Sequence, residues 1–402
     1  MRGKTRRSRI WISAVILATT VVAGQSLPAN AAVATAEGHR GVLINELRTE
    51  LNQYLTSHGT PEHISAVGLT ITFPDHRNHD AISLSAGTTT YGGHTPISPR
   101  ALWQIGSNTK AFTSVMLLQL EAEGKLSLDD TLGTWLPQYP AWSHVTIRQL
   151  LNMTSGIADY TVQPAFLKTL SANPNTEFTT ARLVSDASGL PLGTGYEYSN
   201  TNYLLAQLII ERATHDTYGD QLEKRIQDPL HLHDTCYAPT TCPASTPTRM
   251  PAGYFFESPQ SPLQGSAVPP LNLTSAQASG AIIASLQDMA TWDRALYDGE
   301  LLPPQQQHEL ESLVSTQTGQ PITTTTPADP SGYGLGVLQI TTPLTGTAWL
   351  YEGETFGFRA LHLYLPDSGT LIALATNSAT GPTDQLPTLL ATVYRTLQNS
   401  AL

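Results

Sequence analysis

Two stripes of apolar residues, one near each end of the chain, predict amphipathic helices. Apolar positions recur every three or four residues over 43–55 and again over 386–397, the spacing that places them on one helix face. Gly59 and Pro61 end the first stripe. Between the stripes, β-rich runs bounded by turn residues predict strands over 64–73, 81–89, 333–340, 347–351, 358–365 and 370–376.

The middle of the chain has a different pattern. Over residues 91–286, helical stretches alternate with long connections rich in proline and threonine. The first two strand runs flank the polar loop 74–80 and predict a hairpin, and strands from both ends must then meet in one antiparallel sheet. We therefore predict an α/β (α+β) fold. Residues 32–90 and 287–402 form a sheet domain flanked by the two terminal helices, and residues 91–286 form an inserted helical domain.

One helical stretch carries a pair of reactive side chains. Apolar residues over 112–120 continue without a proline to Gly124, which suits a left-handed C-cap, so a mostly buried helix is predicted to start near Ser107 with Gly106 just outside it. Residues three apart share a helix face, so Ser107 and Lys110 point the same way at the positive end of the helix dipole. This layout fits a serine nucleophile with an amine beside it. The alternative for this motif alone is an ordinary capping serine.

A second polar group precedes another apolar helix. Tyr198-Ser199-Asn200 stands just before the apolar run 204–210, which places a phenol and an amide at a loop edge. A phenol beside an ammonium ionises more easily and is then able to take the serine proton. The Asn200 amide can hold a substrate amide with both its donor and its acceptor. The alternative is an asparagine N-cap next to a buried tyrosine.

The first 31 residues have the composition of a secretory signal peptide. A basic start with five Lys and Arg residues precedes the apolar run 10–23 and the small-residue cleavage site Ala29-Asn30-Ala31. The Arg6-Arg7 pair also fits twin-arginine export, but we expect the general pathway. Removing this leader changes the balance from 21 basic and 32 acidic residues to 16 and 32, a net charge of −16.

This acidic balance argues against nucleic acid and anionic membranes as partners. No second apolar run is long enough to span a bilayer. We therefore expect a secreted protein without a membrane anchor, a monomer whose partner is a small-molecule or peptide substrate.

The cysteines and histidines predict a disulfide rather than a metal site. Cys236 and Cys242 lie six residues apart, and in an exported protein we expect them to form a local disulfide. Two groups are candidate metal ligands: His76, His79 and Asp80, and His231, His233 and Asp234. No His-Glu-x-x-His helix accompanies either group and each fits an exposed loop, so we expect no metal and no cofactor. The lack of a Gly-x-Ser-x-Gly elbow argues against an α/β-hydrolase.

With both motifs in this order, the chain resembles the penicillin-recognising serine hydrolases. The similarity is to the branch that holds class C β-lactamases, secreted D-alanyl-D-alanine carboxypeptidases and related esterases. Ser107-x-x-Lys110 looks like the first motif of this family and Tyr198-x-Asn200 like the second. The segments 124–130, 150–156 and 275–301 also resemble the family, and the resemblance extends over roughly residues 62–397. It implies a β-lactamase/transpeptidase-like fold.

The resemblance also implies an acyl-enzyme route. Ser107 attacks a carbonyl carbon while Lys110 and Tyr198 relay the proton to the leaving group, and the Ser107 backbone N–H forms half of an oxyanion hole. The pKa of Lys110 should be depressed because a tight site desolvates the amine. The chain has no counterpart of the glutamate motif of class A β-lactamases, so water activation through Tyr198 is expected.

The third motif departs from the family. The usual Lys or His, then Thr or Ser, then Gly is replaced by Tyr351-Glu352-Gly353, and Glu354 follows at the position that would supply the second oxyanion N–H. With Asn200, the residues Tyr351, Gly353 and Glu354 are the candidate substrate-binding residues.

The usual cation helps to hold a substrate carboxylate. Tyr351 offers only a neutral hydroxyl, Glu352 and Glu354 would add repulsion if they faced the site, and Arg359 compensates only if it faces the site. This change weakens the case for β-lactam and D-Ala-D-Ala cleavage and favours an ester or neutral amide.

We therefore expect an exported serine hydrolase. Its leading activity by resemblance is D-alanyl-D-alanine carboxypeptidase or a related D-amino-acid amidase, followed by carboxylesterase and then class C type β-lactamase. A different class of function is non-catalytic binding of β-lactams or peptidoglycan. A β-lactam sensor needs a membrane segment to signal, and an inactive scaffold would be free to lose Ser107, Lys110 and Tyr198, which are all present.

Overall fold

The structure is a computed structural model of the 402-residue chain that describes residues 29–74, 81–256, 264–265, 267–268, 272–380 and 384–400. Most of the expected signal peptide lies outside the described residues, as do the candidate metal ligands His76, His79 and Asp80. The predicted cleavage site and domain boundaries stay predictions.

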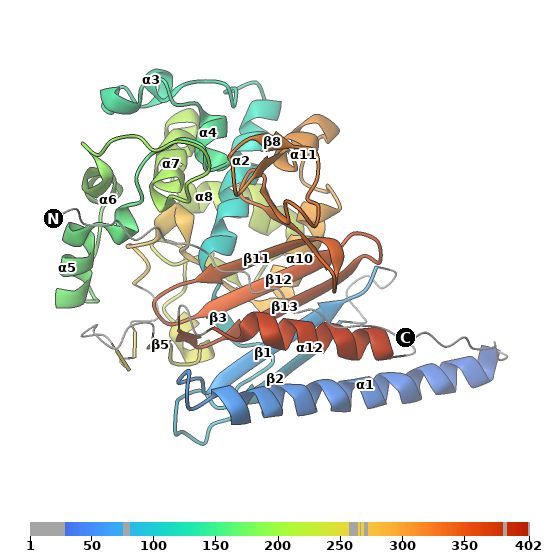
Figure 1. The fold of residues 1–402 in the computed structure, drawn as a ribbon. Helices are drawn as coiled ribbons and strands as arrows, with labels where there is room; N and C mark the ends of the chain where they lie inside the picture. Colours follow the sequence, from blue (N-terminus) through green and yellow to red (C-terminus); the bar gives the residue numbers. More distant parts are fainter. Residues whose placement is uncertain are drawn as a thin grey trace.

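A nine-stranded antiparallel sheet runs through the described part of the molecule (Figure 1), in the order β2-β1-β13-β12-β11-β10-β9-β7-β8. Its strands are β1 (Ala66–Thr72), β2 (Ile82–Gly87), β7 (Leu313–Ser315), β8 (Pro321–Ile322), β9 (Ser331–Tyr333), β10 (Leu338–Thr342), β11 (Gly346–Glu354), β12 (Arg359–Leu365) and β13 (Thr370–Thr376). Strand β1 pairs with its hairpin partner β2 and also with β13, where Val67 lies opposite Thr376. The predicted meeting of strands from the two ends of the chain is thus confirmed.

The two terminal helices, α1 (Ala29–His58) and α12 (Leu386–Asn399), cover one face of this sheet (Figure 1). Their apolar stripes point inward, as the spacing predicts. Leu43, Leu47 and Val393 are at most 1% exposed and pack with sheet residues such as Leu363. Helix α10 (Leu286–Tyr297) packs against β1, β12 and β13 from the other side.

The helical part lies beyond the α10 face of the sheet, above it in Figure 1. Its helices are α2 (Thr109–Ala122), α3 (Leu132–Trp135), α4 (Ile147–Leu151), α5 (Pro164–Ala172), α6 (Thr180–Ala187), α7 (Asn200–Thr214), α8 (Tyr218–Leu222), α9 (Asp228–Leu230) and α11 (Pro304–Leu310). Single turns are η1 (Gly106–Asn108), η2 (Pro140–Trp142), η3 (Tyr160–Val162), η4 (Glu223–Gln227), η5 (Thr246–Arg249) and η6 (Gln277–Ser279). Strands β3 (Leu102–Gln104), β4 (Thr235–Tyr237) and β6 (Ile282–Ser285) form a small sheet, and β5 (Tyr254–Phe255) pairs with β14 (Ser378–Ala379).

Helix α2 is buried along most of its length, as its apolar sequence predicts. Phe112 stacks on Trp292 of α10 with ring centroids 3.7 Å apart, and Gly124 adopts the left-handed conformation with φ of +68°. The start of the helix differs from the prediction. Ser107 lies in the 3₁₀ turn η1 and the α-helix begins at Thr109, because Gly106 at φ of +54° turns the chain against the β11 backbone.

The predicted strand over 333–340 is two strands, β9 and β10. Gly336 breaks the run with φ of +81°, and a Cβ there would lie 2.7 Å from Ser114 Oγ and 3.0 Å from the Lys110 carbonyl carbon. The β9–β10 turn therefore approaches α2 more closely than a residue with a side chain allows.

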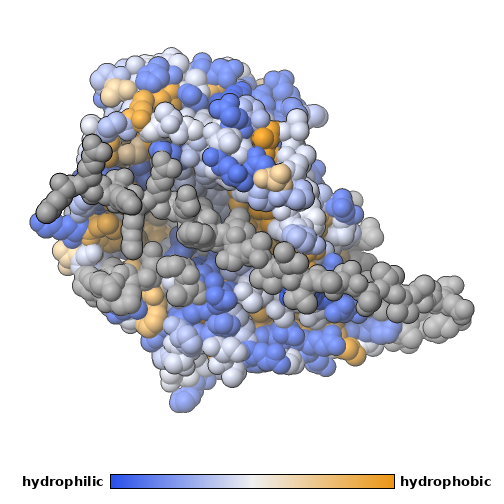
Figure 2. Space-filling model, in the orientation of Figure 1, coloured by the Kyte–Doolittle hydropathy of each residue, from blue (hydrophilic) through white to orange (hydrophobic). Residues whose placement is uncertain are grey.

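Cys236 and Cys242 are joined by a disulfide with their Cα atoms 5.0 Å apart. Asp234, from the second candidate metal cluster, pairs with Arg249, and the described residues contain no group of three or more His, Cys, Asp or Glu able to hold a metal. None of the described helices is long and apolar enough to cross a membrane. On the face seen in Figure 2, hydrophilic residues cover much of the described surface and hydrophobic residues are scattered between them.

Candidate active site

Ser107 and Lys110 lie together where β3 leads through η1 into α2. Lys110 Nζ is 3.0 Å from Ser107 Oγ. Nζ is also 2.8 Å from Asn200 Oδ1 and 2.7 Å from the main-chain oxygen of Ser279, in the turn η6. The Lys110 side chain is fully buried. These three oxygens are its hydrogen-bond partners among the described residues.

Burial favours the neutral form of this amine, which can direct a lone pair at Ser107. Burial lowers the pKa of Lys110 to about 7, and the charge of Asp159 opposes this shift. The carbonyl oxygens of Asn200 and Ser279 can only accept hydrogen bonds, so they take the two N–H bonds of a neutral amine. The remaining lone pair then faces the Ser107 hydroxyl. The sequence prediction of a depressed lysine pKa is confirmed.

Tyr198 completes the contact around the serine, because its hydroxyl lies 2.7 Å from Ser107 Oγ. The segment 150–156 holds the Tyr198 loop in place. The Glu197 N–H donates to the Met153 carbonyl at 2.9 Å, and the Gly193 N–H donates to the Gly156 carbonyl at 2.8 Å. Three side chains from distant parts of the sequence thus converge at the start of α2.

The expected easy ionisation of Tyr198 is wrong for this structure. Burial raises the pKa of Tyr198 above its ordinary value, Asp159 raises it further, and hydrogen bonds with Ser107 and Tyr351 only oppose the rise. At neutral pH the Tyr198 phenol is therefore a proton donor. Lys110 is the better acceptor for the serine proton, and Tyr198 is placed to deliver a proton to the leaving group.

Asn200, the first residue of α7, has both ends of its amide engaged. Its Oδ1 accepts from Lys110, and its Nδ2 lies 3.2 Å from Asp159 Oδ2 and 3.5 Å from Thr161 Oγ1. In this geometry Asn200 orients Lys110. Burial raises the pKa of Asp159, while hydrogen bonds from Thr161 and Asn200 and the charge of Lys110 oppose the rise.

Strand β11 packs directly against the nucleophile turn. A Cβ added to Gly106 would lie 2.6 Å from the Glu354 nitrogen, and one added to Gly353 would lie 2.6 Å from the Ser107 nitrogen. Two glycines without side chains therefore bring these backbone amides close to each other, as an oxyanion hole requires. Tyr351, two residues before Gly353, is 5% exposed, and its hydroxyl is 2.7 Å from that of Tyr333.

The charged residues of the third motif do not share the face of Tyr351. Side chains alternate along β11, so Glu352 lies on the opposite face from Tyr351, and its carboxyl, with a pKa raised to about 7 by burial, is close to the charge of Arg359. Arg359 is fully buried, binds Glu62 at 2.9 Å and contacts Asp384. Arg359 therefore does not compensate for the missing cation, and Glu352 adds no repulsion at the serine.

Three contributors to the site were not predicted from the sequence. Asp159 binds Asn200, the Ser279 carbonyl binds Lys110, and Tyr333 binds Tyr351. Asp159 lies just after the family-like segment 150–156, which is a usable signal. Ser279 lies inside the family-like segment 275–301, although nothing there singles out its main-chain carbonyl, and Tyr333 on a separate strand leaves no comparable pattern in the sequence.

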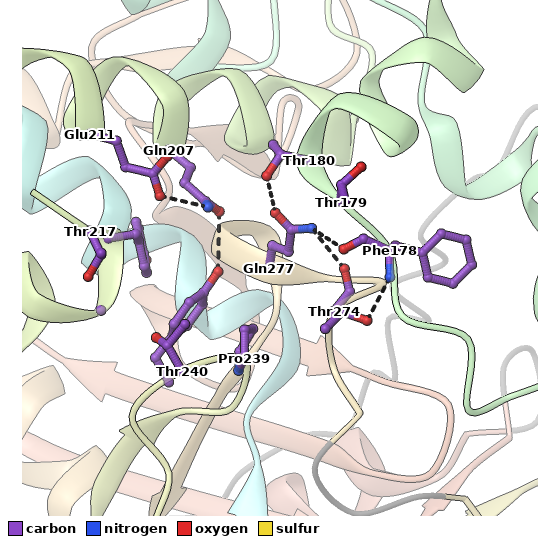
Figure 3. A pocket seen from close by; sticks show the side chains of 13 residues that line it. Phe178, Thr179, Thr180, Gln207, Glu211, Thr217, Pro239, Thr240, Thr274 and Gln277 are labelled. Carbon is purple, nitrogen blue, oxygen red and sulfur yellow. Dashed lines mark hydrogen bonds between the residues drawn. The ribbon is translucent and has the colours of Figure 1, made fainter.

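A separate cavity of about 260 Å³ lies between α6, α7, α8 and η6 (Figure 3). Polar side chains line it, including Gln207, Glu211 and Gln277, and Gln277 donates to the carbonyls of Phe178 and Thr274. Ser107, Lys110 and Tyr198 do not line this cavity. It is therefore distinct from the catalytic group.

Replacing Gly353 by alanine is expected to lower kcat/KM by about 100-fold, the cost of losing one oxyanion donor. The new Cβ would lie 2.0 Å from the Ile105 carbonyl oxygen, so β11 must move away from η1. Gly41→Ala makes the same change on α1, where nothing lies within 4 Å, and should keep wild-type activity. Full activity of the Gly353 variant would show that this close packing is not needed for turnover.

Comparison with known proteins identifies the family. The family model described as Beta-lactamase matches residues 76–393. This chain belongs to the beta-lactamase family. Together with the assembled Ser107, Lys110 and Tyr198, this membership makes the protein a serine hydrolase of the β-lactamase and penicillin-binding protein superfamily.

Solved structures of similar proteins include an amidohydrolase and an amidase. A D-stereospecific amidohydrolase from Streptomyces sp. superimposes with a TM-score of 0.69 and 29% identity, covering 82% of this β-lactamase-family chain and 94% of its own. The D-amino acid amidase from Ochrobactrum anthropi SV3, complexed with L-phenylalanine amide, gives a TM-score of 0.73 at 23% identity and covers 90% and 99% of the two chains. At this identity, the second likeness shows the shared fold alone.

Among curated proteins, Penicillin-binding protein 4* of Bacillus subtilis (strain 168) is 26% identical over 292 residues. This alignment covers 70% of the present chain and 62% of the relative. Protein flp of Staphylococcus aureus (strain COL) is 34% identical over 149 residues, which is 36% of this chain and 29% of flp. The chain therefore spans less than two thirds of the length of these relatives.

Proposed function

We propose that this serine hydrolase cleaves the amide bond of D-amino-acid amides or related D-amino-acid peptides through an acyl-enzyme on Ser107. The observation that carries the chemistry is the contact of Ser107 Oγ with both Lys110 and Tyr198, at 3.0 and 2.7 Å. The similarity to a D-stereospecific amidohydrolase supports the substrate class.

The steps follow from the geometry. Neutral Lys110 takes the Ser107 proton as Oγ attacks the carbonyl carbon, and the amides of Ser107 and Glu354 stabilise the oxyanion. When the carbon–nitrogen bond breaks, Tyr198 donates its proton to the leaving nitrogen. Lys110 returns its proton to Tyr198, and a water molecule then hydrolyses the acyl-enzyme.

The lack of a cation at the third motif favours substrates without a carboxylate next to the scissile bond. The hydroxyl of Tyr351 is bonded to Tyr333, and Arg359, on the neighbouring strand β12, is bonded to Glu62. A D-Ala-D-Ala peptide or a β-lactam would therefore lack the cation that usually binds its carboxylate. The same observation supports a second candidate function, carboxylesterase, because an ester needs no such cation.

A substrate panel tests these proposals. Purified protein is assayed on D- and L-phenylalanine amide, an acylated D-Ala-D-Ala peptide, a p-nitrophenyl ester and a chromogenic cephalosporin. We expect turnover of the D-amide and the ester, with kcat/KM at least 10-fold higher for the D-amide than for the L-amide or the D-Ala-D-Ala peptide. Faster cleavage of the D-Ala-D-Ala peptide would contradict the carboxylate argument, and turnover of the ester alone would select the esterase.

Export, an unanchored secreted protein and a monomeric state are further proposals. The basic leader followed by an apolar run supports export. Mass spectrometry of protein recovered from the culture medium should find an N-terminus near residue 32. Size-exclusion chromatography with light scattering should give the mass of a single chain.

A further inference from the structure

We propose that Asn108, held by His362 of β12, is a positioning residue that sets the oxyanion hole by fastening the Ser107 turn to the strand pair β11–β12. The inference rests on the proposed acyl-enzyme chemistry at Ser107 and adds two residues to it. Both residues act through the positions of the Ser107 and Glu354 backbone amides, and neither is assigned a contact with the substrate.

The Asn108 side chain is directed at the sheet. Asn108 directly precedes α2, where a polar side chain often caps the helix, but among the described residues it makes no cap hydrogen bond. Its Nδ2 instead donates to the Ile105 carbonyl at 2.8 Å and to the Ala360 carbonyl of β12 at 3.0 Å. Asn108 is 3% exposed, so water competes little for these bonds. One side chain therefore joins the nucleophile turn to the central sheet.

The bond to β12 lies beside the two oxyanion amides. Ala360 is paired with Gly353 across the β11–β12 ladder. A Cβ added to Gly353 would lie 2.8 Å from Asn108 Nδ2 and 2.6 Å from the Ser107 nitrogen, so both nitrogens approach the same glycine. Glu354 is the next residue along β11. The Asn108 amide therefore holds the turn that carries one oxyanion donor against the strand pair that carries the other.

His362 determines the orientation of the Asn108 amide. Its Nδ1 lies 3.0 Å from Asn108 Oδ1 and 3.3 Å from Asp293 Oδ1 of α10. The two carbonyls at Asn108 Nδ2 can only accept, so Oδ1 must face His362, and Nδ1 must carry the proton that it donates. Burial lowers the pKa of His362 to about 3, so the ring is neutral and its Nε2 accepts from the Tyr297 hydroxyl at 2.7 Å.

These contacts form a buried polar chain that ends one residue after the nucleophile. Asn108, His362 and Asp293 are at most 3% exposed. A buried polar group that loses its partner costs free energy, so removal of one member loosens the others. Loosening the chain moves the Ser107 amide relative to β11. Because an oxyanion is stabilised only when both amides point at it, we expect the effect in the transition state rather than in substrate binding.

The test compares an ester with its thionoester in Asn108→Leu, which keeps the approximate size of the side chain without its amide. The substrates are D-phenylalanine methyl ester and the matching thionoester, in which sulfur replaces the carbonyl oxygen. Sulfur accepts hydrogen bonds poorly, so a displaced oxyanion hole penalises the oxygen ester more. We expect kcat/KM to fall about 10- to 100-fold on the oxygen ester and less than about 3-fold on the thionoester. The loss should lie in kcat, with KM within about 3-fold of wild type.

Two variants of His362 test the donor behind Asn108. His362→Leu removes the ring N–H and should lower kcat/KM by about 3- to 30-fold on the oxygen ester, again with little change on the thionoester. His362→Asn keeps a side-chain N–H donor near the position of Nδ1. It should therefore recover hydrolysis of the oxygen ester to within about 3-fold of wild type.

Asn377→Leu is the matched control. Asn377 is also a buried asparagine, and its side chain binds Ser65 and Ala252 rather than the nucleophile turn. Whatever stability this variant loses, the ratio of kcat/KM for the oxygen ester to that for the thionoester should stay at the wild-type value.

Equal losses on the two esters would show that Asn108 only stabilises the fold, and wild-type rates in Asn108→Leu would show that it has no role. A wild type that does not distinguish the two esters would show that no oxyanion hole assists the reaction. If Asn108→Leu does not fold, equal rates for His362→Leu and His362→Asn on the oxygen ester decide against the proposal. Each of these outcomes overturns this inference and leaves Ser107 as the nucleophile. Wild-type turnover by a Ser107→Ala variant would instead overturn the proposed function itself.

Discussion

Ser107→Ala should reduce kcat/KM by roughly 10⁴-fold or more on every substrate that the wild type hydrolyses, because it removes the atom that forms the acyl-enzyme. Ser107 Oγ is hydrogen-bonded to both Lys110 and Tyr198, and no other described hydroxyl contacts both of these side chains. The measurement is steady-state hydrolysis of D-phenylalanine amide and a p-nitrophenyl ester. Intact-mass analysis after treatment with a fluorophosphonate should show one adduct on the wild type and none on the variant.

Ser199→Ala is the matched control for this experiment. Ser199 is also buried and directly follows Tyr198, but its hydroxyl has no hydrogen-bond partner among the described residues. The control should keep activity and labelling within about 3-fold of wild type. Equal labelling of the Ser107 variant and the wild type would place the nucleophile elsewhere.

The secondary structure near the site was predictable because it depends on local periodicity. Spacing alone places Ser107 and Lys110 on one side of a helix start, and the apolar run that follows predicts a buried α2. The two terminal stripes likewise predict which helix faces meet the sheet. The 3₁₀ turn at Ser107 was not predictable, because it depends on contact between Gly106 and a strand almost 250 residues later.

The electrostatics of the site could not be predicted from the sequence and depend on the three-dimensional structure. Alternation along β11 predicts that Tyr351 and Glu352 face opposite ways, but only the fold shows which one faces the serine. Ionisation of Tyr198 was predicted from a neighbouring charge, whereas burial acts in the opposite direction and is larger. Asp159 and Tyr333 reach the site through tertiary contacts that local periodicity does not encode.

The second large effect that we expect is a loss of activity when Lys110 is protonated or replaced. Burial lowers its pKa to about 7, so the neutral amine that accepts the Ser107 proton forms as pH rises through this value. The acylation rate of the wild type, measured as kcat/KM, should therefore increase between pH 6 and 8 and then level. Lys110→Met retains the length of the side chain without the amine and should lower kcat/KM by about 1,000-fold, within the range expected for loss of a general base.

The same substitution tests the pKa through stability. The folded-state pKa of Lys110, about 7, lies below the unfolded value of 10.5, so between these two values the unfolded chain binds more protons than the folded one. Stability contributed by this site therefore rises with pH across that window. Relative to Lys110→Met, the wild type should gain roughly 2 kcal/mol in free energy of unfolding from pH 7 to pH 9. Urea unfolding of both proteins at the two pH values measures this difference.

Lys125→Met is the matched control, because it removes an exposed lysine just after the same helix. Its stability difference from the wild type should stay constant between pH 7 and pH 9. A constant difference for Lys110→Met as well would mean that the folded protein keeps Lys110 charged over this range. The lone pair would then not be available to Ser107, and the proton would have to leave the serine through Tyr198 instead.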